Sequence, residues 1–334
     1  MMKVLGIGNA LVDILTRLKN DEFLEKYSLQ KGVMQLVDHN FIKELLDATL
    51  HLPKKLSSGG SAANTIHGLA RLGIPSAFMG KIGDDEFGKI FLDDLKRSQI
   101  EPLLYYSLSP TGRAFTMVSP DGERTFATFL GASVELLEDD IESEVFKGCD
   151  LFHIEGYLVQ NHKLIEKCVR MAKKNHLKVS LDLASHNIVK AHREFLLGLM
   201  EEYVDIVFAN DEEARALTGK SPEESVIDMS DDCEIAVVKL GEYGSLIKRG
   251  NEQYAIQAIK AKCIDTTGAG DLYAAGFLYG LIKGKNLEWC GRAGSLLSGK
   301  VVEVLGAKLE EEQWDEVKSE LSLLDEGTVS SIPE

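Results

Sequence analysis

The chain has 334 residues, with 53 acidic and 37 basic side chains and a formal net charge of −16. This charge argues against a nucleic-acid partner and against binding to an anionic membrane surface. No apolar run approaches the length of a membrane span. The five cysteines are scattered and form no C-x-x-C pair, which argues against a disulfide framework or a zinc site and favours reduced thiols in the cytoplasm.

Short apolar runs alternate with amphipathic stretches along most of the chain. Runs that are apolar throughout and separated by helical patterns are typical of parallel strands covered on both faces. We therefore expect an α/β fold with a doubly wound, mostly parallel sheet and helices on both faces. The expected strands are KVLGIGNA (3–10), SAFMGKIG (76–83), DLFHIEGY (150–157), KVSLDL (178–183), DIVFAN (205–210) and IAVVKL (235–240).

Two regions interrupt this alternation, residues 16–37 and residues 101–129. Three segments of the second region alternate as hairpin strands do, with a turn at Pro120-Asp121-Gly122. These segments are YYSLS (105–109), GRAFTMVSP (112–120) and ERTFATFL (123–130). We therefore expect a small β-rich lid, residues 16–37 and 101–129, inserted into an α/β domain of residues 1–15, 38–100 and 130–334. An exposed edge of this lid would allow two copies to pair as a homodimer.

The stretch GGSAANTIHGLARLG, residues 59–73, predicts a helix that follows a glycine pair and ends at Gly73. Ser61 is a candidate cap, and Asn64 lies in the first turn. The amide of Asn64 either serves the helix alone or points beyond the strand ends, where ligands bind in doubly wound sheets. Asp13 follows the first strand and would face the same crevice, where a carboxylate can accept hydrogen bonds from two neighbouring sugar hydroxyls. The residues alone leave both interpretations open.

Two further motifs follow expected strands. NDEE, residues 210–213, comes directly after DIVFA, and Asn210 and Glu213 have the spacing of a capping box. The same residues also suit a magnesium–phosphate site, in which oxygen ligands hold a hydrated ion. KLGEYG, residues 239–244, is either a hairpin turn or a turn that approaches a nucleotide.

DTTGAGDLYAAGFLYGL, residues 265–281, combines a glycine turn with the start of a helix. Its apolar positions recur at helical spacing, so we expect the helix to begin near Gly270 or Asp271. Unpaired N–H groups and the positive end of the helix dipole coincide at such a start, which suits a phosphate group. A tight turn in which Asp271 complements the dipole is the alternative.

Together these motifs resemble the PfkB, or ribokinase-like, family of small-molecule kinases. DTTGAGD is similar to the second signature of that family, GGSAANTIHGLARLG to the first, and N-x-x-E to its magnesium-associated motif. GNALVD, residues 8–13, matches its substrate-binding segment near the amino terminus. The resemblance implies a ribokinase-like fold and an ATP-dependent phosphotransferase whose acceptor is an alcohol group.

The resemblance also implies roles for individual residues. Asp271 is the general base that takes the proton of the acceptor hydroxyl, and we expect it to be ionised at neutral pH because a helix start favours the anion. Backbone N–H groups from Gly268 to Asp271 form the anion hole for the phosphoryl group. The full implied set is Gly268, Ala269, Gly270 and Asp271 for catalysis; Asp13, Gly59, Gly60 and Asn64 for the acceptor; Asn210 and Glu213 for Mg²⁺; Asn210, Lys239, Gly241, Gly244 and Arg124 for the nucleotide; and Asp265 and Thr267, with loop residues near Gly306, for a monovalent cation such as K⁺.

Arg124 resembles a lid arginine that reaches the phosphates in some relatives, and an exposed hairpin charge is the alternative. For the acceptor, EKYSLQKGVMQLVD, residues 25–38, resembles the adenosine-kinase branch, whereas the rest of the chain is compatible with sugar kinases such as fructokinase or ribokinase. We expect a carbohydrate kinase, with a nucleoside kinase as the alternative. A non-catalytic sugar or nucleotide sensor is a third hypothesis, disfavoured because Asp271, Asn210 and Glu213 are all retained.

Overall fold

The computed structural model describes residues 2–325, and within them nine strands form the larger of two sheets, in the order β14-β13-β12-β11-β10-β9-β1-β5-β6. Seven neighbouring strands of this sheet, β12, β11, β10, β9, β1, β5 and β6, run parallel to one another. Strands β13 and β14 add an antiparallel hairpin at the edge beside β12. Their bounds are β1 Val4–Ile7, β5 Ser76–Gly83, β6 Ile100–Ser107, β9 Leu151–Glu155, β10 Lys178–Asp182, β11 Ile206–Asn210, β12 Ile235–Lys239, β13 Ser245–Arg249 and β14 Glu252–Ile256.

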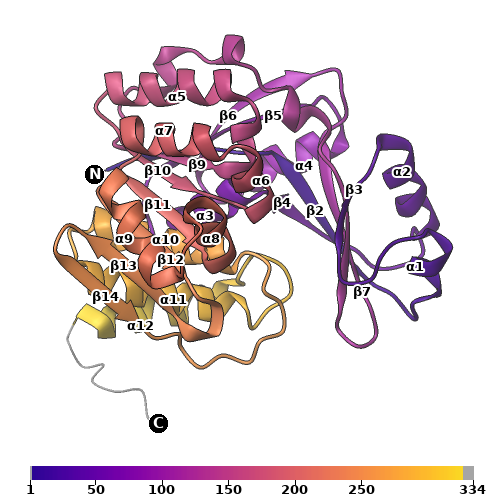
Figure 1. The fold of residues 1–334 in the computed structure, drawn as a ribbon. Coiled ribbons are helices and arrows are strands. Elements are labelled where there is room, and N and C mark those ends of the chain that lie inside the picture. The colour runs from indigo at the N-terminus through magenta and orange to yellow at the C-terminus, as the bar shows by residue number, and fades with distance from the viewer. Residues whose placement is uncertain (1, 326–334) are drawn as a thin grey trace.

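Helices cover both faces of this sheet (Figure 1). Consecutive residues of a strand point to opposite faces, so strands that are apolar throughout need helices packed on both sides. Ile206 and Phe208 of β11 pack in one buried apolar cluster, while Val207 packs in the other. The first cluster includes residues of α3 Ser61–Arg71, α4 Glu86–Arg97, α10 Ala269–Ile282, α11 Leu287–Val301 and α12 Glu311–Asp325. The second includes residues of α5 His162–Lys174, α6 His186–Ala191, α7 Arg193–Tyr203, α8 Asp211–Thr218 and α9 Pro222–Asp232. The predicted doubly wound α/β fold is confirmed.

A second sheet of five strands in the described residues forms a lid beside the main body (Figure 1). Its order is β3-β8-β7-β2-β4, and β7 and β8 form an antiparallel hairpin around the predicted turn at residues 120–122. The bounds are β2 Leu11–Arg17, β3 Met34–Leu36, β4 Lys55–Gly59, β7 Gly112–Val118 and β8 Arg124–Phe129, with helices α1 Glu22–Lys26 and α2 His39–Ala48. Met34 and Leu36 on the edge strand β3 are exposed, and pairing of two copies through the lid stays a prediction.

The sheets divide the chain differently from the predicted boundaries. The segment YYSLS belongs largely to β6, which pairs in parallel with β5 in the main sheet, so its assignment to the lid was wrong. Strand β6 lies at the edge of the main sheet and its side chains are partly exposed. Its sequence therefore mixes polar and apolar residues, as the sequence of a strand in the small lid sheet would. Conversely, β2 and β4 belong to the lid sheet, although residues 11–15 and 55–59 were assigned to the main domain. Strand β2 begins soon after β1, so the two strands look like one apolar run in the sequence.

Short 3₁₀ helices complete the structure at η1 Gly131–Glu135, η2 Glu138–Asp140, η3 Ser143–Phe146, η4 Gly156–Gln160 and η5 Gly241–Tyr243. None of the helices in residues 2–325 combines the length and the apolar character needed to cross a membrane.

Candidate active site

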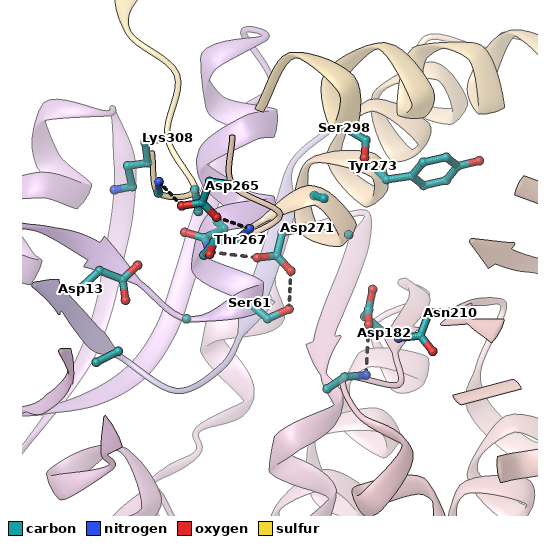
Figure 2. A pocket seen from close by; sticks show the side chains of 18 of the residues that line it. Asp13, Ser61, Asp182, Asn210, Asp265, Thr267, Asp271, Tyr273, Ser298 and Lys308 are labelled. Carbon is teal, nitrogen blue, oxygen red and sulfur yellow. Dashed lines mark hydrogen bonds between the residues drawn. The ribbon is translucent and has the colours of Figure 1, made fainter. Parts of the chain in front are cut away.

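A cavity of about 570 Å³ is lined both by the lid and by the carboxyl ends of the main-sheet strands. The last residues of β10, β11 and β12, which are Asp182, Asn210 and Lys239, all line it. Ligands in open parallel sheets bind at this edge. Figure 2 shows Asp271 between Asp13 on one side and Asp182 and Asn210 on the other. The cavity therefore has a lid end and a strand end, and the carboxylate of Asp271 lies between them.

Helix α10 begins at the glycine turn, one residue before the predicted start. Gly268 is its N-cap with φ 77° and ψ 0°, a left-handed conformation that favours glycine. The amide of Ala269 donates to the carbonyl oxygen of Thr266 at 3.1 Å, so this member of the expected anion hole is already engaged. Gly270 and Asp271 lie in the first turn, where N–H groups have no acceptor within the helix. Ala269, Gly270 and Asp271 all line the cavity.

The carboxylate of Asp271 is held by the first turn of α3. Ser61 Oγ donates to Oδ1 at 2.7 Å, and Asn64 Nδ2 donates to Oδ2 at 2.9 Å. Thr65 Oγ1 also donates to the main-chain oxygen of Asp271 at 3.1 Å. Burial raises the pKa of Asp271 to about 6, while the hydrogen bonds from Asn64 and Ser61 limit the rise. At this pKa Asp271 is mainly ionised at pH 7, and the hydrogen bonds from Ser61 and Asn64 orient its carboxylate.

The N-terminus of α3 differs from the prediction. Ser61 is not its cap: the N-cap is Gly60, with φ 99° and no side chain to offer, and Ser61 instead binds Asp271. The amide of Asn64, expected to face the acceptor, also holds Asp271, although Asn64 lines the cavity. The expected end of the helix is confirmed, since α3 ends at Arg71 and Gly73 follows with φ 80°.

Asp13 lies in lid strand β2 and lines the cavity. Its carboxylate packs over Gly59, where a Cβ atom would lie 2.2 Å from Oδ1, so the glycine provides the space for the acid. Desolvation raises the pKa of Asp13 to about 7, the ammonium group of Lys308 opposes this rise, and the charge of Asp271 adds to it. Asp13, Gly59 and Gly60 are thus brought together at the lid end.

Asn210 and Glu213 form a complete capping box at the start of α8. Asn210 Oδ1 accepts from the Glu213 amide at 2.8 Å, and the two Glu213 oxygens accept from the Asn210 amide and from Nδ2, each at 2.8 Å. Glu213 is buried, and burial together with the charge of Asp182 raises its pKa. Both residues line the cavity. Each oxygen of Glu213 keeps a lone pair, which fits either direct ligation of Mg²⁺ or a hydrogen bond from one of its water ligands.

Lys239 and Asp182 form a buried ion pair at the strand end, with Nζ and Oδ2 2.8 Å apart. Nζ also lies 3.0 Å from the position that a Cβ of Gly270 would occupy. A positive charge therefore sits beside the first turn of α10. Gly241 and Gly244, which follow β12 in a turn with positive φ, line the same end of the cavity.

A model of the pfkB family carbohydrate kinases matches residues 51–314 of this chain. The chain belongs to the pfkB family. An uncharacterized sugar kinase of Archaeoglobus fulgidus is 32% identical over 248 residues, which cover 72% of this chain and 96% of that protein. The adenosine kinase of Saccharomyces cerevisiae is 26% identical over 331 residues, covering 90% of this chain and 94% of its own.

Two solved structures resemble the whole chain. A probable sugar kinase from Rhizobium etli has a TM-score of 0.85 at 37% identity, covering 96% of this chain and 98% of its own. An adenosine kinase from Sinorhizobium meliloti has a TM-score of 0.85 at 36% identity, covering 96% of this chain and 99% of its own. The protein is thus a sugar or nucleoside kinase of the pfkB family, a phosphotransferase with an alcohol group as acceptor and ATP as the phosphate donor.

Arg124 of this pfkB kinase joins the lid to the glycine turn. Its guanidinium group pairs with Asp265 and donates to Thr267 Oγ1 at 2.6 Å, and its side chain is only 14% exposed. The alternative of an exposed hairpin charge was therefore wrong. Asp265 also accepts from the amides of Thr267 and Gly306, at 2.6 and 2.8 Å. Because Arg124 already neutralises Asp265, this arrangement does not fit a monovalent cation bound there.

Among the charged residues that the sequence analysis did not single out, Asp182 and Lys308 line the cavity, and Glu155 accepts a hydrogen bond from the first turn of α3. Glu155 and Asp182 each end an apolar strand, and this position, which drew attention to Asn210, is the signal that could have found them. Lys308 lines the cavity, donates to Ser58 Oγ at 2.6 Å and pairs with Asp94. No pattern around Lys308 in the sequence marks it, because its partners lie more than 200 residues away.

Proposed function

We propose that this protein transfers the γ-phosphoryl group of ATP to a hydroxyl of a sugar ring, with Asp271 as the general base. The observation that carries this proposal is the placement of Asp271. Its carboxylate is oriented by Ser61 and Asn64, has a pKa of about 6, and lies at a helix start between the two ends of the cavity. A base in this state is ready to accept a proton at neutral pH.

In the proposed reaction the acceptor hydroxyl lies against Asp271, with its neighbouring hydroxyls on Asp13 at the lid end. The hydroxyl oxygen forms a bond to the γ-phosphorus, the bond from this phosphorus to the bridging oxygen of ADP breaks, and the hydroxyl proton passes to Asp271. The amides of Gly270 and Asp271 face the transferring group, and Lys239 adds positive charge beside them. Mg²⁺ would supply charge neutralisation on the phosphates, with Asn210 and Glu213 holding its water.

The lid end of the cavity favours a nucleoside over a free sugar. Leu15, Ala114 and Phe126 of the lid strands line this end together with Asp13. A flat heterocyclic base can cover such apolar side chains, while Asp13 binds the hydroxyls of the attached ribose. A monosaccharide is the second candidate, because Ser57 and Thr116 offer polar contacts in the same wall.

A screen of ADP formation across purine and pyrimidine nucleosides, pentoses and hexoses tests both parts of the proposal. We expect a nucleoside to give the highest kcat/KM. A higher kcat/KM for a free sugar would reject the nucleoside while leaving the kinase intact. Binding of nucleosides or sugars without any ADP formation would reject the enzyme in favour of a sensor. Localisation in the cytoplasm also stays a proposal, supported by the scattered cysteines and the acidic composition.

A further inference from the structure

Glu155 is a buried carboxylate for which the proposed reaction has no use. It is the last residue of β9, an interior strand of the main sheet, and is 1% exposed. Its Oε1 accepts from the Asn9 amide at 3.3 Å and from Asn9 Nδ2 at 2.6 Å, and its Oε2 accepts from the Ala62 amide at 3.1 Å. One side chain therefore ties the segment after β1 to the first turn of α3.

Glu155 does for α3 what an N-cap side chain does for other helices. The N-cap Gly60 has no side chain, and a Cβ there would lie 2.1 Å from the carbonyl oxygen of Asn9, so no larger residue fits. The first-turn amide of Ala62 needs an acceptor from elsewhere, and Glu155 supplies it from β9. The hydroxyl of Ser61, the residue next to Gly60, is thereby left to bind Asp271.

The second partner of Glu155 is Asn9, which lies close in the chain to Asp13, the residue that the proposed reaction places on the acceptor hydroxyls. Asn9 lies two residues before β2, the lid strand that carries Asp13. Both arms of Glu155 thus end beside residues of the cavity, because Ala62 follows Gly60 and Ser61 and because Asn9 precedes the strand of Asp13, although Glu155, Asn9 and Ala62 do not line it themselves. Two hydrogen bonds joined by one peptide link connect Glu155 to Asp271: Glu155 accepts from the amide of Ala62, and the preceding residue, Ser61, donates its hydroxyl to Asp271.

We propose that Glu155 is a positioning residue for phosphoryl transfer: it caps α3 from the neighbouring strand, so that Ser61 and Asn64 hold Asp271 in the reactive geometry. This inference rests on the proposed role of Asp271 as the base. It adds that the orientation of this base depends on a carboxylate that touches neither substrate.

Glu155→Gln tests the proposal, because it keeps the shape of the side chain but replaces one accepting oxygen with an NH₂ group. We expect kcat to fall about 10- to 100-fold, since a shift of about 1 Å at a reacting group can cost about 100-fold. KM for ATP should stay near the wild-type value. A merely structural role would lower the melting temperature and leave the kcat of the folded enzyme unchanged, and that result would overturn the proposal.

A double-mutant cycle with Ser61→Ala sharpens the test. If Glu155 acts through the contacts of Ser61 and Asn64 with Asp271, the double variant loses less activity than the product of the two single losses. Fully multiplicative losses would contradict the path. Asp271→Asn in the same assay separates a failure of the proposed function from a failure of the inference about Glu155. If Asp271→Asn keeps its turnover, the proposed function fails, whatever the behaviour of Glu155→Gln.

Asp205→Asn is the matched control. Asp205 also accepts a backbone hydrogen bond, from Val179 at 2.7 Å, and pairs with Lys173, but it precedes β11 at the opposite end of the strands. We expect reduced stability and unchanged kcat. If Glu155→Gln is insoluble, Glu155→Asp replaces it, because the shorter side chain keeps its charge but cannot reach both Asn9 and Ala62. The same fall in kcat is expected, and wild-type kcat would overturn the proposal.

Discussion

Removing the hydroxyl of Ser61 should move the acid limb of the pH profile of kcat to higher pH. Ser61 Oγ donates to Asp271 Oδ1 at 2.7 Å, and this bond stabilises the ionised form of a buried carboxyl whose pKa is about 6. A hydrogen bond to a charged group is worth about 1.5–3 kcal/mol, which corresponds to about 1–2 pH units at 1.36 kcal/mol per unit. At pH 7 the ionised fraction of Asp271 would fall from about nine tenths to between about one half and one tenth.

The sign follows from the role of a base, which must be deprotonated to act. Activity is lost as the pH falls through the pKa, and loss of a donor raises that pKa. The assay is kcat between pH 5 and pH 9, measured as ADP release at saturating substrates for the wild type and Ser61→Ala. Ser298→Ala, which removes another hydroxyl of the cavity lining, serves as the control with an unmoved limb. An acid limb that stays near pH 6 in Ser61→Ala would refute the reasoning.

Three other changes test the lid end of the cavity, its strand end, and the ion pair between the lid and the glycine turn. Asp13→Ala should lower the acceptor kcat/KM by about one to two orders of magnitude and leave KM for ATP unchanged; an unaltered acceptor kcat/KM would remove Asp13 from the substrate site. Glu213→Gln should raise the Mg²⁺ concentration that half-saturates activity, whereas an unchanged requirement in folded protein would leave Glu213 as a helix cap alone. Arg124→Ala leaves the buried carboxylate of Asp265 without its cation and should lower the free energy of unfolding in urea by about 3 kcal/mol; a loss below about 1 kcal/mol would contradict a buried pair.

Local signals in the sequence predicted the elements that carry the site. The helical spacing after residue 268 and the glycines at residues 59 and 60 placed the starts of α10 and α3 within two residues, because helix starts depend on nearby backbone conformation. The boundary of the lid was missed at β6, since its alternation reflects its place at the sheet edge and not the sheet to which it belongs.

The contacts among site residues could not be predicted in the same way. The partner of Ser61 lies 210 residues away, and that of Arg124 lies 141 residues away. Local sequence favours Ser61 as the cap of α3. In the folded chain Glu155 accepts from the first-turn amide of Ala62 instead, and the hydroxyl of Ser61 donates to Asp271. The capping box of Asn210 and Glu213 was one of the two interpretations that the sequence offered, because both of its members are near neighbours in the chain.

The most direct test of the central claim is the turnover of Asp271→Asn. Asparagine preserves the shape of the side chain and its place beside Ser61 and Asn64, but it cannot accept the proton of the acceptor hydroxyl. Loss of general-base catalysis is worth about 10²–10⁴-fold, so kcat should fall by at least about 100-fold while the variant binds Mg-ATP with the wild-type Kd by calorimetry. Near-wild-type kcat in the folded variant would contradict the assignment of Asp271 as the base.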